Sequence, residues 1–140
     1  MEIRVAKLLR DAGIQPSAQR VAVADAEYVL ATSDHPTADK VWAKVRKSFP
    51  MISRATVYNT LNLFVEGGLL RQFVLGGRKT VFDASVGNHH HFVDEETGRV
   101  YDIPFEALSV SKLESLSGFD VRDYHVVARG RMKNGARKRG

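Results

Sequence analysis

The sequence predicts an α+β fold in which a winged helix-turn-helix is followed by a small α/β dimerisation domain. Apolar residues recur at helical spacing as far as Glu66 and then alternate as they do in strands. Two predicted helices are separated only by a short turn, and a predicted β-hairpin follows them. A helix pair with a hairpin directly after it is the pattern of a winged helix-turn-helix.

The first two helices are predicted over residues 2–12 and about 17–30. Gly13 ends the first helix, because glycine readily takes the left-handed conformation that closes a helix. The hydroxyl of Ser17 is placed to accept a free backbone N–H at the start of the second. The inward side chains of the first helix are Ile3, Val5, Ala6 and Leu9.

The third and fourth helices are predicted over residues 38–49 and 54–66, with Thr37 and Ser53 as their N-caps. Pro50 follows the third helix, and two glycines stop the fourth. Their apolar stripes are Val41, Trp42, Val45 and Phe49 in the third and Val57, Leu61, Phe64 and Val65 in the fourth.

Strand-like segments follow at residues 69–75 and 78–83, and Gly76-Gly77 between them predicts a hairpin turn. A second hairpin is predicted from residues 87–94 and 99–104. A short helix over 105–116 and a last strand over 119–131 complete this part, which is too small to be stable alone and is therefore expected to dimerise. The domains are predicted as 1–84 for the winged helix, 85–131 for the dimerisation and metal-binding domain, and 132–140 for a disordered basic tail.

Composition excludes several classes of protein. The 140-residue chain has no cysteine, which rules out disulfides, cysteine-bound structural zinc and cysteine nucleophiles. No apolar run reaches membrane-spanning length and the N-terminus does not resemble a secretory signal, so we expect a cytoplasmic protein without a membrane partner. Residues 1–84 carry 12 Lys/Arg against 8 Asp/Glu, whereas residues 85–131 carry 5 against 8. The basic first part is suited to binding a polyanion.

The fourth helix is the candidate DNA reader, because the second helix of a helix-turn-helix enters the major groove. Opposite its buried stripe lie Arg54, Tyr58 and Asn62, with Asn59 beside them. Arginine can bind guanine edges or phosphate, and asparagine can pair with adenine. An ordinary solvated helix face is the alternative, and the basic charge and the hairpin favour DNA. The predicted DNA-binding residues are Ser53, Arg54, Thr56, Tyr58, Asn59, Asn62 and Arg20.

Three adjacent histidines, residues 89–91, are the chain's most unusual motif. On a strand, His89 and His91 share one face and His90 points to the other. His35, Asp83 and Asp102 could complete a set of three nitrogen and two oxygen donors, which suits Fe(II), Mn(II) or Zn(II). A surface cluster of histidines with turn aspartates remains the alternative from spacing alone.

Two segments carry a resemblance to a known family. "HPTADKVWAKVRKSFPMISRATVYNTLNLFVEGGLLRQ" and "HHHF…TGRVYDIP" resemble the core of the ferric uptake regulator family, over roughly residues 5–131. The resemblance implies a winged-helix domain joined to an α/β dimerisation domain. It also implies a homodimeric, metal-responsive transcription factor, a repressor rather than an enzyme, that binds A/T-rich inverted repeats of double-stranded DNA.

The resemblance further implies a regulatory metal site at the hinge between the domains, holding Fe(II) or Mn(II), with Zn(II) possible in vitro. Its ligands would be His35, Asp83, His89, His91 and Asp102. In the peroxide sensors of the family, which also have Asp at the position of Asp102, bound Fe(II) reacts with peroxide and oxidises a histidine ligand. The matching positions are His35 and His91. The metal is then released, and the DNA after it.

Two alternatives stay open beside the peroxide sensor. The histidine triplet, the absence of cysteine and the basic C-terminus also resemble the haem-responsive iron regulators, in which His89, His90 and His91 would be haem ligands. A mononuclear non-haem metal enzyme could use the same His/Asp set, but no substrate pocket is indicated. The residues considered for a second metal or for haem are His90, Glu106 and His125. His125 stands one residue away from the matching family position, which on a strand is the opposite face.

Overall fold

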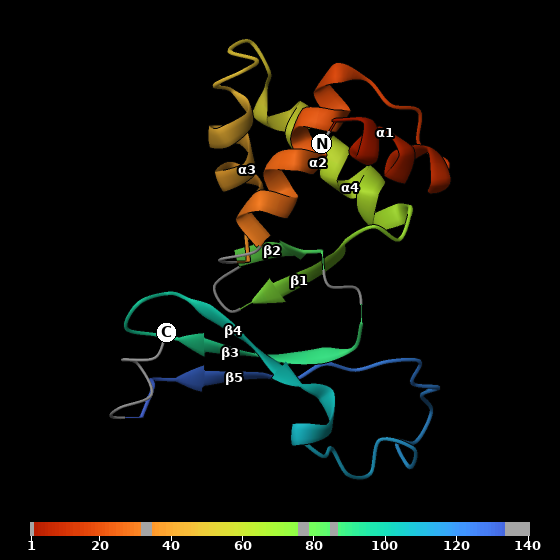
Figure 1. Ribbon diagram of the computed structural model, residues 1–140. Helices are drawn as coiled ribbons and strands as arrows, with labels where there is room; N and C mark the ends of the chain where they lie inside the picture. The colour runs from red at the N-terminus through yellow and green to blue at the C-terminus, as the bar shows by residue number, and fades with distance from the viewer. Residues whose placement is uncertain (1, 32–34, 76–78, 85–86, 134–140) are drawn as a thin grey trace. The chain divides into compact units, whose positions relative to one another are not determined.

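The structure, a computed structural model, describes residues 2–31, 35–75, 79–84 and 87–133 (Figure 1). The chain divides into two compact units, Met1–Val86 and Gly87–Gly140. Helices are followed by small sheets, which confirms the predicted α+β class. No helix within the described ranges is long and apolar enough to cross a membrane. Most of the tail predicted over 132–140 lies outside these ranges.

Four helices form the first unit: α1 (Glu2–Asp11), α2 (Ala18–Ala31), α3 (Ala38–Val45) and α4 (Arg54–Glu66). The predicted caps are confirmed. The hydroxyls of Ser17, Thr37 and Ser53 each accept the backbone N–H three residues later, at 3.2, 3.3 and 3.0 Å. Each bond satisfies one of the backbone donors that a helix start leaves without a partner.

Helix α3 is shorter than predicted, because it ends at Val45 rather than near residue 49. The chain continues in turns, in which Lys47 N–H donates to Lys44 O and Ser48 N–H to Val45 O. Pro50 disfavours the helical conformation only at Phe49, so it does not explain why the helix already ends at Val45.

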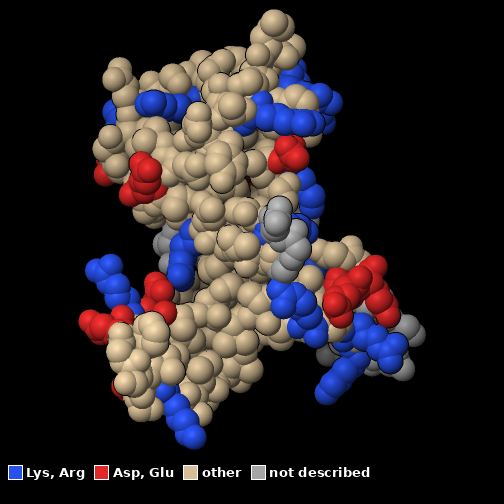
Figure 2. Space-filling model, turned by 180° about the vertical axis from the view of Figure 1, so that it is seen from behind, with Lys and Arg blue, Asp and Glu red and all other residues tan. Residues whose placement is uncertain are grey.

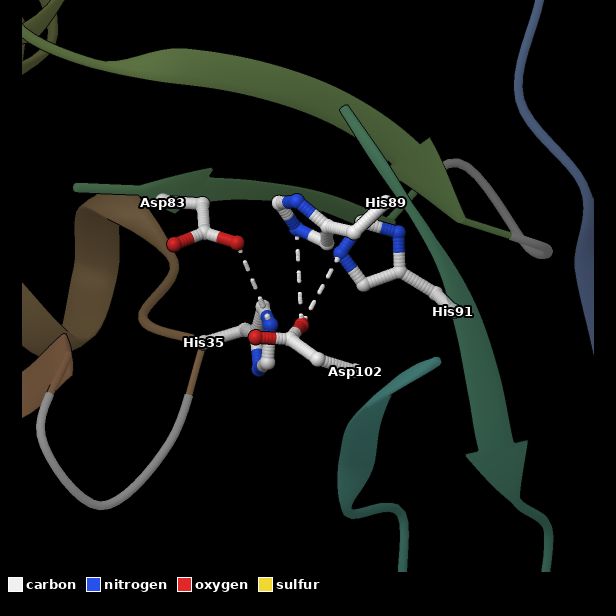
Figure 3. A group of neighbouring side chains, drawn as sticks. All are labelled: His35, Asp83, His89, His91 and Asp102. Carbon is white, nitrogen blue, oxygen red and sulfur yellow. Dashed lines mark ion pairs between the residues drawn. The ribbon is translucent and has the colours of Figure 1, made fainter. Parts of the chain in front are cut away.

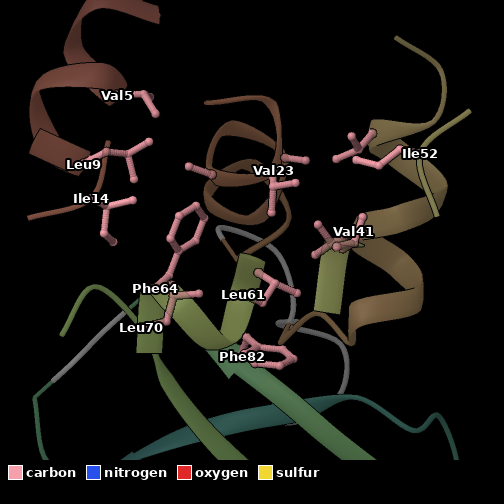
Figure 4. Close-up of a cluster of buried hydrophobic side chains, with 14 residues drawn as sticks. Val5, Leu9, Ile14, Val23, Val41, Ile52, Leu61, Phe64, Leu70 and Phe82 are labelled. Atoms are coloured by element: carbon pink, nitrogen blue, oxygen red, sulfur yellow. The ribbon is translucent and has the colours of Figure 1, made fainter. Parts of the chain in front are cut away.

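The core of the first unit lies among its helices and β2 (Figure 4). Val23, Val41, Val57, Leu61 and Phe82 are all completely buried. Most of the predicted stripe residues are buried, but Trp42, Phe49 and Val65 are only partly buried at the margin of this core. The core thus fixes α4 with its opposite face turned away from the apolar interior.

The predicted wing is confirmed as an antiparallel hairpin of β1 (Arg71–Leu75) and β2 (Lys79–Asp83). Arg71 pairs with Asp83 and Leu75 with Lys79. The turn predicted at Gly76-Gly77 lies outside the described residues. Both α2 and α3 contact β2, so the wing is attached to the helical core.

The second unit contains a sheet of three strands: β3 (His89–Asp94), β4 (Val100–Pro104) and β5 (Val127–Gly130). Strand β3 lies in the middle, antiparallel to β4 and parallel to β5. The predicted turn between β3 and β4 is closed by a bond from Gly98 N–H to Asp94 O, with Gly98 at a φ of +78°. Glycine takes this φ without strain.

Two predicted elements of the second unit were wrong. Residues 105–116 form only a 3-10 turn, η1 (Phe105–Ala107), instead of a helix. Ser109, Val110 and Ser111 are weak helix formers, and Lys112 has a φ of +69°, which no α-helix contains. The last strand begins at Val127 rather than at 119, and it pairs with β3 from His91 to Asp94.

Candidate functional site

The first unit supplies two candidate metal ligands, His35 and Asp83 (Figure 3). His35 precedes α3, and Asp83 ends β2. The backbone N–H of Phe82 donates to Pro36 O at 2.9 Å, which attaches the loop before α3 to the end of the wing. His35 Nε2 therefore lies 3.4 Å from Asp83 Oδ2, with the side chains only 10% and 8% exposed.

The second unit supplies three more, and the sheet geometry brings them together. His89 and His91 share one face of β3, and Asp102 on β4 pairs directly with His91. The Nε2 atoms of both histidines lie 3.5 Å from Asp102 Oδ1 (Figure 3). Both imidazoles are buried, whereas the Asp102 side chain is 48% exposed. The predicted sharing of a face by alternate histidines is thus observed.

Hydrogen bonds orient the two rings. His89 Nδ1 lies 2.8 Å from Gly87 O, and a carbonyl can only accept, so Nδ1 carries the proton and the neutral ring keeps its lone pair on Nε2. His91 Nδ1 lies 2.7 Å from His125 Nε2. When His91 donates in this bond, its Nε2 is likewise available to a metal. Metal-binding histidines usually have a second hydrogen bond of this kind.

The donor set fits a divalent metal ion. Three imidazole nitrogens and two carboxylate oxygens, without any thiolate, favour Fe(II), Mn(II) or Zn(II) over softer ions. The first unit contributes one nitrogen and one oxygen donor, and the second contributes two nitrogens and one oxygen. Neither contribution alone fills the coordination sphere of such an ion.

Glu27 is a buried acid that the sequence analysis missed. Its side chain is fully buried on α2, and neither carboxyl oxygen has a hydrogen-bond partner among the described residues. Burial, and to a smaller extent the nearby carboxylate of Asp83, raise the pKa of Glu27 to about 8 against the opposing effect of His35. Glu27 is therefore largely protonated at neutral pH. Glu27 lies three residues after the buried Ala24 and four residues after the buried Val23. This helical spacing was the signal in the sequence that its side chain lies on the buried face of α2.

The three residues considered for a second metal or haem make different contacts. His90 is fully buried, stacks on Phe105 with ring centroids 4.7 Å apart, and accepts the N–H of Val126 at Nδ1. His125 faces His91, as described above. Glu106 is an exposed residue of η1. The structure thus places His90 and His125 in separate surroundings.

The predicted DNA-binding residues lie mainly at the start of α4. Ser53 caps this helix, and its hydroxyl is 2.8 Å from that of Thr56. Tyr58 is 43% exposed, and its ring lies nearly perpendicular to that of Phe82. Asn59 and Arg54 are exposed, whereas Asn62 and Thr56 are half-buried.

Arg20, the remaining predicted DNA-binding residue, belongs to α2 and not to α4. It is half-buried near the start of α2, and its Nη1 donates to Gln15 O at 2.8 Å. The bond joins Arg20 to the loop before its own helix.

Comparison with known proteins agrees with this geometry. Residues 11–128 match the model of the ferric uptake regulator family. The peroxide-responsive repressor PerR of Staphylococcus aureus (strain Mu50) is 32% identical over 120 residues, which cover 84% of this chain and 80% of the relative.

Solved structures show the same likeness. The peroxide stress regulator of Campylobacter jejuni is 27% identical with a TM-score of 0.63, covering 94% of this chain and 96% of the other. The ferric uptake regulator of Pseudomonas aeruginosa, solved with manganese, is also 27% identical with a TM-score of 0.63, covering 91% and 96%. The chain belongs to the ferric uptake regulator family.

Proposed function

We propose that this chain is a metal-responsive transcriptional repressor whose two units bind one divalent ion together. The observation that carries the proposal is the division of the ligands. His35 and Asp83 belong to the first unit, and His89, His91 and Asp102 belong to the second. An ion bound by both sets supplies the positive charge that holds the two units in one arrangement. Because such an ion binds only that arrangement, metal shifts the population toward it.

The side chains have distinct roles in this proposal. His35, already beside Asp83, binds from the loop before α3 and so ties the metal state to the helix-turn-helix. His89 and His91 bind through Nε2, with their Nδ1 atoms oriented by Gly87 and His125. Asp102, the most exposed of the five proposed ligands, balances the charge of the ion.

We further propose Fe(II) or Mn(II) as the regulatory ion and peroxide as the signal. The donor set favours these ions, and Zn(II) would also bind in vitro. A solved relative carries manganese, and two relatives are described as peroxide regulators. Aspartate at position 102 is also the residue that the peroxide-sensing resemblance implies.

The proposed partner is an A/T-rich inverted repeat of double-stranded DNA, bound in the cytoplasm by a homodimer. Residues 1–84 would provide the DNA-binding domain, through α4 and the wing. Residues 85–131 would provide the dimer interface, for which the exposed apolar side chains of the second unit are suited. Three of them, Leu116, Phe119 and Val121, are 47%, 74% and 38% exposed.

Haem is the second candidate signal, and one observation favours it. His90 Nε2 is buried and has no hydrogen-bond partner within the described part of the chain. However, the N–H of Val126 occupies Nδ1, so the proton of the neutral ring is on Nε2 and would have to leave before ligation. Haem titration of the wild type and of His90→Ala tests whether His90 binds haem. A Soret band that is the same in both proteins would show that His90 is not a haem ligand.

Metal titration tests the shared site. We expect Mn(II) binding, followed by electron paramagnetic resonance, to show one tight ion per chain. Both His35→Gln in the first unit and His91→Gln in the second should abolish it. Glu114→Gln, at an exposed residue outside every candidate ligand set, is the control and should retain it. Tight binding retained by either histidine variant would show that the two units do not share one ion.

A further inference from the structure

Trp42 carries two arginines on its indole ring. The guanidinium carbon of Arg46 lies 4.3 Å from the ring centroid, and that of Arg54 lies 4.5 Å from it. Arg46 is the C-cap of α3 and Arg54 is the first residue of α4, so the stack joins the two helices of the helix-turn-helix. Both distances are well within the range of cation–π attraction.

The indole is a fixed platform for these arginines. It is half-buried at the edge of the core, and its Nε1 donates to Ile52 O at 3.0 Å. Ile52 is itself buried and directly precedes the cap of α4. The ring is therefore attached to the turn between the helices. Two long side chains that would otherwise move freely are held beside it, which lowers the entropy lost when they bind a ligand.

The platform has an excess of positive charge. Asp39 Oδ1 lies 3.6 Å from Arg54 Nε, with both side chains mostly exposed. Within the described part of the chain, this is the carboxylate paired with the two arginines of the platform, and it contacts Arg54. An arginine that stacks through its flat face still directs its N–H donors outward in the plane of the group, in a geometry that matches phosphate oxygens.

The position of the platform indicates which anion it binds. In a helix-turn-helix the helix before the reading helix crosses the DNA backbone, and α3 holds that place here. The start of α4, where Arg54 lies, also presents backbone N–H groups and a partial positive charge to an anion. A phosphate of the duplex is the anion common to both positions.

We propose that Trp42, Arg46 and Arg54 form a preorganised clamp for a backbone phosphate of DNA, so that Arg54 positions α4 without reading a base. This inference rests on the DNA-binding function and assigns Arg54 to the backbone rather than to guanine. Contacts to phosphate fix the register of the protein on the duplex and are independent of sequence.

Salt-dependent fluorescence anisotropy tests the clamp. The full chain, loaded with Mn(II), is titrated onto an A/T-rich inverted-repeat duplex and onto a scrambled duplex of the same composition. We expect Arg46→Gln and Arg54→Gln to weaken binding to both duplexes by the same factor. Each should also reduce the salt slope by roughly one phosphate contact per chain. Arg122→Gln, an exposed arginine of the second unit, controls for the loss of net charge and should change neither quantity.

The outcomes separate the possibilities. A loss on the inverted repeat alone would make Arg54 a base reader and overturn the clamp, as would unchanged binding to both duplexes. Failure of the wild-type protein to bind either duplex would contradict the DNA-binding function itself. Arg54→Lys keeps the charge but loses the planar fork, so it should keep the salt slope while binding both duplexes more weakly.

Trp42 provides a second readout, because it is the only tryptophan of the chain. We expect DNA to change its fluorescence in the wild type, and to change it much less in the Arg46→Gln/Arg54→Gln double variant. Circular dichroism should show that this variant still folds, since both arginines are exposed and outside the core. If bound DNA leaves the wild-type emission unchanged, the platform does not bind a phosphate of the duplex.

Discussion

His125 contacts His91, one of the proposed metal ligands, in this structure. Its Nε2 lies 2.7 Å from His91 Nδ1, and the two rings meet nearly edge to face.

This contact gives a prediction for metal affinity. His125→Phe keeps a ring of similar size but removes the hydrogen bond, so Mn(II) affinity should fall about 10-fold or more. His125→Gln can restore a polar partner and should recover most of the affinity. Isothermal titration calorimetry of both variants decides the point, and equal affinities for the two would show that His125 only fills space.

Glu27 gives a prediction for the pH dependence of stability without metal. Burial is the main cause that raises its pKa from the ordinary value of 4.5 to about 8 in the folded state. Between these values the folded chain holds a proton that the unfolded chain has lost. Stability should therefore fall as pH rises from about 4.5 to about 8, by up to about 1.4 kcal/mol per pH unit.

Glu27→Gln keeps the shape of the side chain and removes the titration. Urea unfolding in excess chelator should show a flatter pH profile for this variant over the same interval. A profile as steep as that of the wild type would assign the pH dependence to other groups. The neutral variant should also be the more stable of the two near pH 8.

The sequence could identify the five ligand candidates but not their surroundings. Strand alternation and the family resemblance were sufficient to select His89 and His91 as candidate ligands on one face of a strand. Helical spacing places Glu27 on the same face as Ala24 and Val23, but how deeply it is buried depends on the packing of α2 against β2, which is distant in the sequence. For the same reason, the stacking of Arg54 on Trp42 was not foreseen.

At the scale of elements, α4 was the most predictable part of the chain. Its observed bounds, Arg54–Glu66, are those predicted, because Ser53 and the glycines mark both ends locally. Residues 105–131 were the least predictable. Their conformation depends on which part of β3 is available for pairing, and the helical spacing in 105–116 was outweighed by poor helix formers.

The cap of α4 gives a prediction of its own. Ser53→Ala removes the acceptor of the Thr56 N–H and should lower the free energy of unfolding by about 1 kcal/mol. Ser53→Asp retains an acceptor, so stability should be preserved. Its negative charge at the start of the reading helix should nevertheless weaken DNA binding. Chemical unfolding and anisotropy measure the two effects, and a Ser53→Asp variant with unchanged DNA affinity would place this helix start away from the duplex.

At the scale of the whole molecule, the proposed dimer depends on the second unit. Phe119→Asp should convert the dimer to a monomer in light-scattering measurements, because it places a charge in an apolar interface. Val74→Asp is the control, since Val74 is an exposed apolar residue of β1, at 65% exposure, and should leave the dimer intact. Mn(II) affinity should survive in both variants, because the five proposed ligands all belong to one chain. A dimer that persists in Phe119→Asp would show that the surface around Phe119 is not the dimer interface.

The two-part organisation follows from the change of hydrophobic period and of charge, whereas the role of each domain remains a prediction. Sequence patterns are local, and they report neither how one ion would join two units nor which surface meets a second chain. These properties depend on the folded arrangement and on bound partners.

Anisotropy of the wild-type protein on an A/T-rich inverted-repeat duplex, at one fixed salt concentration, tests the central claim most directly. The titration is performed with excess chelator and again with Mn(II). The shared site predicts tight binding with Mn(II) and at least a 10-fold weaker affinity with chelator. Equal affinity under the two conditions would contradict a metal-dependent repressor.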